Sequence, residues 1–179
     1  MRLLVRMEQV HGSKVVLVDS KSAGKIMKSC DGLVTSDKNA TLRVDVADCL
    51  PIFIFDPTNN NIGLVHAGWR GLEKGVIANA IKLMSKEVVV YIGPHICQKH
   101  YEVKKNVYQK FADYSEVLML KNGRAFLDLA EVARIQMIAL GVKPKNITIS
   151  SDCTFENKSL LSYRRDKTEK RTHYLFQIP

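Results

Sequence analysis

The chain has 179 residues, of which 46% are hydrophobic and 25% are charged, and its formal net charge is +9. This length suits one domain with a sizeable core, and the composition is that of an ordinary soluble globular protein. A membrane protein is excluded because no apolar run approaches the ~20 residues of a span, and the N-terminal MRLLVRMEQ lacks the apolar stretch of a secretion signal, so we expect a cytoplasmic location.

Short apolar runs bounded by turn residues predict strands through the first third of the chain. The expected strands span residues 1–5, 14–18, 33–35, 41–46, 50–55 and 62–65. Residues 22–29 are too mixed to assign. The last two strands are separated by a short, turn-rich segment, which favours a hairpin or an adjacent pair.

Helical spacing of apolar residues begins beyond this pair. We expect helices over residues 75–86, 106–111 and 130–140, and strands over residues 88–92 and 147–150. Gly141 follows the third helix, as a C-terminal glycine cap should. Strands alternate with helices without a strict βαβ repeat, which indicates one α+β domain covering residues 1–179.

The two hairpin strands each carry a reactive side chain at one end. Cys49 precedes the strand 50–55, and His66 is the first polar residue after the apolar run 62–65. Arg70 follows in a turn flanked by two glycines, just before the helix expected at 75–86, whose N-terminus suits an anion. We therefore expect a thiol, an imidazole and a guanidinium to converge.

Structural roles remain open for each of these residues taken singly. A cysteine in an apolar stretch is usually a small buried hydrophobe, and a histidine after a strand is more often a hydrogen-bonding residue than a ligand. Arg70 equally suits a structural arginine stacked on an aromatic ring. The four cysteines are widely spaced and form no CxxC, which argues for free thiols and against a disulfide scaffold or a local zinc knuckle.

The positive charge keeps a nucleic-acid-binding module as a rival class. Lysines and arginines are spread along the chain, with one denser patch over residues 164–171. No helix-turn-helix, zinc-finger or RNP pattern accompanies them. A basic field that attracts small anions explains the charge equally well, and we favour it.

The segments ADCLP, residues 47–51, and VHAGWRGL, residues 65–72, resemble the signature of the YfiH-like family. This family was once called the multicopper polyphenol oxidoreductase or laccase-domain family, and its members include FAMIN-type purine-metabolising enzymes. Further blocks that resemble the family in the same order are QVHG, DGLVT, YIGP, YEV, LDL, CT and SYRRD. The resemblance covers nearly the whole chain and implies a layered α-β-β-α sandwich with mixed sheets.

The resemblance also implies a metal site. His11, Cys49 and His66 match the family's histidine, cysteine and histidine ligands of zinc, or of copper in some preparations. Their spacing alone matches no compact metal motif. Zinc held this way activates water near neutral pH, as deamination of adenosine at the purine C6 requires. Asp48 is expected to orient a ligand histidine, or else to be a turn residue.

A second implied activity is purine nucleoside phosphorylase. Adenosine, inosine or methylthioadenosine would react with phosphate to give the free base and ribose 1-phosphate. Holding the phosphate needs cationic donors, and Arg70 is the first candidate, with Arg164 and Arg165 behind it. The resemblance therefore implies purine nucleosides and phosphate as the small-molecule partners.

The chain departs from the family's pattern in two places. It begins almost at the QVHG block, where relatives usually carry a further N-terminal portion that helps to build the pocket. Its tail reads RRDKTEKR, where the family has Arg-Arg-Asp followed by Thr-Gly-Arg, so Arg171 matches only in part. The range of substrates is therefore open.

Two alternative enzymes remain. A cysteine hydrolase acting on cell-wall muropeptides would use Cys49 as nucleophile and His66 or His11 as base. A copper-dependent polyphenol oxidase is the family's older description. The chain has five histidines, fewer than a multicopper oxidase needs, so we do not expect oxidation to be its main role.

Overall fold

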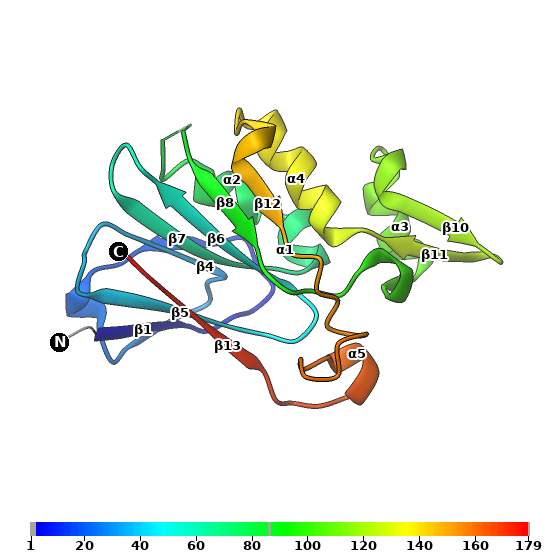
Figure 1. The fold of residues 1–179 in the computed structure, drawn as a ribbon, viewed down its shortest axis with the longest axis horizontal. Coiled ribbons are helices and arrows are strands. Elements are labelled where there is room, and N and C mark those ends of the chain that lie inside the picture. The colour runs from blue at the N-terminus through cyan, green and yellow to red at the C-terminus, as the bar shows by residue number, and fades with distance from the viewer. Residues whose placement is uncertain (1–2, 86, 179) are drawn as a thin grey trace.

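The computed structural model of the chain describes residues 3–85 and 87–178, arranged as two stacked mixed sheets with helices on one side (Figure 1). The first two residues of the strand expected at 1–5, and residue 86 at the end of the helix expected at 75–86, lie outside this part of the chain.

The larger sheet has six strands in the order β12-β8-β6-β7-β4-β2. Its strands are β2 (Val15–Leu17), β4 (Gly32–Thr35), β6 (Leu50–Asp56), β7 (Asn61–Ala67), β8 (Val89–Ile92) and β12 (Ile147–Ile149). The pairs β12–β8 and β2–β4 are parallel and the central pairs are antiparallel. The expected hairpin of adjacent strands is present as β6–β7, in which Pro51 lies opposite His66.

The second sheet has four strands in the order β13-β5-β1-β3. They are β1 (Leu3–Met7), β3 (Ile26–Met27), β5 (Ala40–Val46) and β13 (Thr172–Gln177). A third sheet, β10-β11-β9, stands to one side of the molecule (Figure 1). It comprises β9 (Glu102–Val103), β10 (Leu118–Lys121) and β11 (Arg124–Leu127).

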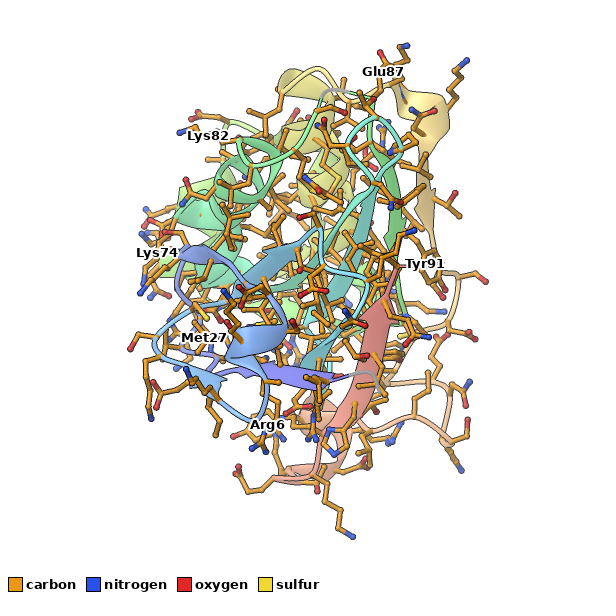
Figure 2. All side chains as sticks on the ribbon, turned by 90° about the vertical axis from the view of Figure 1, so that its left-hand side faces the viewer. Arg6, Met27, Lys74, Lys82, Glu87 and Tyr91 are labelled. Atoms are coloured by element: carbon orange, nitrogen blue, oxygen red, sulfur yellow. The ribbon has the colours of Figure 1, made fainter. Side chains whose placement is uncertain are left out.

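Five α-helices occur among the described residues. They are α1 (Trp69–Glu73), α2 (Val76–Ile81), α3 (Lys105–Tyr108), α4 (Leu129–Ala139) and α5 (Tyr163–Asp166). Helices α1, α2 and α4 pack on the six-stranded sheet. In Figure 2, Lys74 and Lys82 lie on this helical side, whereas Arg6 and Met27 mark strands β1 and β3. None of the helices in the described ranges has the length and apolar character needed to cross a membrane.

Two hydrophobic cores follow from this layering. One lies between the six-stranded sheet and the helices, where Ile52, Ile77 and Val132 are fully buried. The other lies between the two sheets, where Leu42 and Leu64 are fully buried. Strands of both sheets therefore alternate inward and outward side chains, or are buried on both faces where they are central. The α+β class with mixed sheets is confirmed.

The helix expected at 75–86 is wrong in its length, because α2 ends at Ile81. After Ile81 the chain tightens into a turn, since Leu83 and Met84 donate to carbonyls only three residues back. The Asp56 carboxylate then accepts hydrogen bonds from the backbone N–H and the hydroxyl of Ser85, at 2.6 and 2.7 Å. These contacts from the β6–β7 turn end the helix one turn earlier than the apolar spacing predicts.

Candidate functional site

The β6–β7 hairpin places Cys49 and His66 at the same end of the six-stranded sheet. Cys49 directly precedes β6, and His66 is the second-last residue of β7. His11 reaches them from the loop after β1. One side-chain ligand atom from each residue lies within 4.8 Å of the other two. The structure therefore brings together the three residues that the sequence resemblance selects.

The three side chains touch through their rings and sulfur. Cys49 Sγ lies 4.0 Å from His11 Nε2. The His11 and His66 rings meet edge to face, with their centroids 4.7 Å apart. His66 is buried, Cys49 is half-buried and His11 is exposed, so the cluster opens to solvent on the His11 side.

Asp31 holds two members of this cluster and was missed as a site residue by sequence reasoning. Its carboxylate, which is fully buried, lies 2.8 Å from His66 Nδ1. It also accepts the backbone N–H groups of His11 and Gly12, at 2.9 and 2.7 Å. Asp31 thus leaves His66 Nε2 free for the site and fixes the loop that carries His11. The residue reads as a turn in the sequence, and only its place in the DGLVT block points to a role.

The backbone around the cluster is held in uncommon conformations. His11 and Asp48 have positive φ values of 55° and 85°, which non-glycine residues adopt rarely and which cluster at functional sites. Gly68 permits the close approach of the two sides, because a Cβ there would lie 2.9 Å from Cys49 Sγ. The glycine before Trp69 is therefore required by space rather than by its own backbone angles.

The charges of Cys49 and His66 stabilise each other. Burial alone would raise the pKa of the Cys49 thiol, but the nearby His66 charge and the hydrogen bond to His11 lower it to about 6. Burial would likewise lower the pKa of His66, but the Cys49 thiolate and the Asp31 carboxylate raise it to about 9. These shifts favour a thiolate beside an imidazolium at neutral pH.

Asp48 has partners other than those expected from the sequence. Its carboxylate accepts the Thr154 hydroxyl at 2.7 Å and the backbone N–H of Arg164 at 2.6 Å. None of its hydrogen bonds among the described residues goes to a histidine. Asp48 thus ties the Cys49 loop to the C-terminal segment, and Asp31 has the histidine-orienting position instead.

A pocket of about 670 Å³ opens above the cluster. Besides His11, Cys49 and His66, it is lined by the arginines Arg70, Arg164 and Arg171 and by the aromatic rings of Trp69, Tyr101 and Tyr163. This volume is within the usual range for small-molecule sites. Sequence reasoning missed the role of Tyr101 as a wall of the pocket, although Tyr101 lies in the YEV block.

The pocket arginines differ in how firmly they are held. Arg70 is exposed, stacks 4.5 Å from the Trp69 ring centroid, and makes no side-chain hydrogen bond or ion pair with the described residues. It lies within α1 rather than in a turn ahead of a helix, so that expectation is wrong. Arg164 donates to the Glu102 carbonyl at 2.9 Å and lies over the Tyr101 ring.

Arg165 does not line this pocket. Its guanidinium donates to the carbonyls of Thr154 and Leu160, at 2.6 and 2.7 Å, and pairs with Asp166. Side chains of successive helical residues point in different directions, so only one of the Arg164-Arg165 pair reaches the pocket. These contacts hold the Arg165 guanidinium away from the pocket, and the phosphate-binding role expected for it stays a prediction.

The donor set of the cluster fits a transition metal. Two imidazole nitrogens and one thiolate are ligands that zinc prefers, and three protein ligands leave a position open for chemistry. The Asp31–His66 contact matches the carboxylate that commonly backs a metal-bound histidine. Copper accepts the same ligand types, so the donor set does not choose between the two metals.

Comparison with known proteins agrees across sequence and structure. A family model described as multi-copper polyphenol oxidoreductase laccase matches residues 1–175. A purine nucleoside phosphorylase of Streptomyces coelicolor is 31% identical over 94% of this chain and 72% of its own length. A purine nucleoside phosphorylase of Aquifex aeolicus is 34% identical over 91% of this chain and 77% of its own length.

Solved structures resemble the whole chain. The crystal structure of Bacillus licheniformis hypothetical protein YfiH has a TM-score of 0.93 and 26% identity, covering 98% of this chain and 74% of that one. The structure of YlmD from Geobacillus stearothermophilus has a TM-score of 0.91 and 27% identity, covering 99% of this chain and 74% of that one. The fold is therefore shared over nearly all of this sequence.

Proposed function

This chain belongs to the multi-copper polyphenol oxidoreductase laccase family, the YfiH family, and we propose that it is a zinc-dependent purine nucleoside phosphorylase with adenosine deaminase activity. The observation that carries the proposal is a single pocket that joins the His11–Cys49–His66 cluster to the guanidinium groups of Arg70 and Arg164. Relatives of 31 to 34% identity that bear the name purine nucleoside phosphorylase support it.

Phosphorolysis needs an anion held beside the ribose. A phosphate oxygen attacks C1′ while the C1′–N9 bond breaks, and the purine leaves with the bonding electrons and takes up a proton. Arg70 is the residue best suited to hold phosphate, because it is exposed to the pocket and its guanidinium makes no hydrogen bond or ion pair with the described residues. Arg164 faces the same space from the opposite segment.

The aromatic side chains would hold the nucleoside. Trp69 and Tyr101 line the pocket beside Arg70, and flat apolar surfaces of this kind stack on a purine ring. His66 would be held by Asp31 with Nε2 directed into the site, and Cys49 would complete the ligand set with His11. Zinc, when bound, would act as a Lewis acid that activates water near neutral pH, which hydrolytic removal of the adenosine 6-amino group requires.

The test is product identification. Purified protein is incubated with adenosine or inosine, with and without phosphate, and the products are separated by chromatography. We expect adenine from adenosine and hypoxanthine from inosine only when phosphate is present, and inosine from adenosine in either condition. Release of free ribose without phosphate would contradict phosphorolysis, and absence of inosine would remove the deaminase part.

A cysteine hydrolase is the second candidate, and one observation favours it. Cys49, His66 and Asp31 line up as thiol, imidazole and carboxylate, with the pKa of Cys49 lowered to about 6. A nucleophilic Cys49 would be alkylated at the same rate with or without zinc, and it would form an acyl-enzyme with a muropeptide substrate. A metal ligand would be shielded by zinc and alkylated faster after chelation.

A further inference from the structure

A second cluster of metal-ligating side chains lies apart from the pocket. Cys97 and His100 form one pair three residues apart, and Cys153 and Glu156 form another. Each pair occupies a tight turn, since His100 N–H donates to the Cys97 carbonyl at 3.1 Å and Glu156 N–H donates to the Cys153 carbonyl at 3.1 Å. Zinc sites are commonly built from two such short-range ligand pairs. A search for CxxC misses this cluster because each pair mixes cysteine with another ligand.

The two turns meet face to face. The sulfur atoms of Cys97 and Cys153 and a carboxylate oxygen of Glu156 lie within 4.8 Å of one another. His100 Nε2 lies 3.0 Å from the same carboxylate. Cys153 is buried, while the Glu156 side chain is 44% exposed, so an ion can enter from solvent on the carboxylate side.

The backbone holds the cluster in place before any ion binds. His95 and Cys153 form a parallel bridge, and Thr154 N–H donates to the His95 carbonyl at 2.9 Å. The N–H of Cys97 points at Cys153 Sγ, 3.2 Å away. An N–H directed at sulfur stabilises a thiolate and is common where cysteines ligate metals. The His100 ring is also fixed, by stacking on Phe155 with centroids 4.3 Å apart.

We propose that Cys97, Cys153, Glu156 and His100 form a second, structural zinc site. Two thiolates select a soft or borderline cation such as zinc over magnesium or calcium. His100, whose Nε2 lies 3.0 Å from the Glu156 carboxylate, would supply the fourth protein ligand that a structural zinc site requires. This inference stands on its own geometry and does not depend on the activity of the pocket.

A zinc ion at this site would crosslink two segments that support the pocket. Thr154, next to Cys153, donates its hydroxyl to Asp48, which in turn accepts the backbone N–H of Arg164. Zinc joining Cys97 to Cys153 would therefore fix the strand exit at residues 93–97 to the segment that positions Arg164. Loss of the ion is expected to lower stability first and activity only through the pocket's shape.

Zinc must compete with the ammonium group of Lys99 for the Glu156 carboxylate. The Lys99 ammonium pairs with the Glu156 carboxylate. Substitutions of the two partners should therefore shift zinc affinity in opposite directions. Glu156→Gln should weaken binding at least about tenfold, and Lys99→Gln should tighten it severalfold. An ordinary surface ion pair would give both variants the same small change in stability and no change in zinc affinity.

The main experiment counts zinc in the full chain. Protein is stripped with a chelator under reducing conditions, given excess zinc, dialysed and measured by elemental analysis. We expect two zinc ions per chain in the wild type, one in Cys97→Ala, one in Cys49→Ala and two in Cys30→Ala, the matched thiol control. Because Cys97→Ala and Cys49→Ala remove different sites, failure here is distinct from failure of the pocket's metal site.

Three results would overturn the proposal. One is a Cys97→Ala variant that keeps the wild-type zinc content. Another is a Glu156→Gln and Lys99→Gln pair that shift zinc affinity in the same direction or not at all. The third is a chain that binds no zinc at the Cys97 cluster under reductant and forms a Cys97–Cys153 disulfide once an oxidant such as glutathione disulfide is supplied.

Discussion

The protein has two clusters that contain cysteine, and the side chains around the cysteine differ between them. In the pocket, Cys49 lies between two imidazoles, one of them backed by Asp31. In the second cluster, Cys97 lies beside another thiol and a carboxylate, and neither cysteine of that pair lines the 670 Å³ pocket. The first cluster is rich in nitrogen and faces space for a substrate, whereas the second is rich in sulfur and joins two turns.

These surroundings shift the pKa values of Cys49 and Cys97 in opposite directions. The imidazoles lower the pKa of Cys49 to about 6 despite its burial. Burial raises the pKa of Cys97 to about 12, with Cys153 and Glu156 adding to the rise. A thiolate is therefore ready in the pocket, whereas Cys97 forms one only when a cation arrives. Cysteine is thus suited to chemistry in the pocket and to a structural crosslink in the second cluster.

The largest expected effect is the loss of Cys49. Cys49→Ala removes one of three ligands without disturbing a core, so adenosine deamination should fall at least about 100-fold with little change in melting temperature. Cys30→Ala is the control, since Cys30 is a buried thiol outside both clusters. Assays of turnover with saturating zinc measure both. Near-wild-type turnover in Cys49→Ala would erase the contrast between the two clusters.

Asp31→Asn should affect the pocket cluster in two ways. The amide cannot hold the His66 imidazolium or accept all of the loop N–H groups, so turnover should fall about 10- to 100-fold. The unfolding free energy should also fall by about 3 kcal/mol, because a buried charged partner is lost. Denaturant titration and kinetics check the two effects together. A stable variant of full activity would show that Asp31 does not orient His66.

Arg70 and Arg165 form a matched pair for the phosphate role. Arg70→Ala should raise the KM for phosphate about tenfold and leave the melting temperature unchanged, since one charge-assisted contact is worth about 1.5–3 kcal/mol. Arg165→Ala should lower the melting temperature and leave the phosphate KM nearly unchanged, because its guanidinium binds backbone carbonyls. Initial rates at varied phosphate, with thermal melts, measure the difference. If Arg165→Ala raised the phosphate KM and Arg70→Ala lowered the melting temperature instead, the phosphate would be assigned to Arg165.

The smallest expected effect on turnover is that of Asp56, which lies at the end of strand β6 farthest from Cys49. Burial alone would raise the pKa of Asp56, but hydrogen bonds from Ser85 and Asn59 lower it. Its stabilisation is therefore complete above the unfolded pKa of about 3.9 and is lost as the pH falls through the lower folded value. Asp56→Asn should cost about 2 kcal/mol at pH 7, with the gap to wild type closing below pH ~4 and turnover unchanged. Denaturant melts across pH check this, and a gap independent of pH would contradict it.

Sequence reasoning located the hairpin and the convergence of its ends, because Cys49 and His66 adjoin apolar runs that read clearly as strands. It missed Asp31, whose partner His66 is 35 residues away and which looks like a turn locally. It also missed β13, since a strand with alternate exposed residues at the edge of a sheet is defined by pairing with β5 rather than by its own pattern. Contacts between distant segments decide such features.

The roles of Arg164 and Arg165 show the same limit at the level of a side chain. Both belong to the block SYRRD, and the sequence assigns them one role. The turn of α5 sends Arg164 toward Tyr101 and Arg165 toward the carbonyls of residues 154–160. Only the position of that short helix separates a pocket residue from a structural one.

The most direct measurement of the central claim is reconstitution of adenosine deamination by zinc in the Cys97→Ala variant, in which only the pocket cluster should bind zinc. Chelated protein is given adenosine, and inosine is followed as zinc is added. We expect no product in the stripped protein and full recovery at about one zinc per chain. Undiminished product formation in the stripped protein, with Cys49 alkylated as quickly as before chelation, would contradict a metal site made by His11, Cys49 and His66.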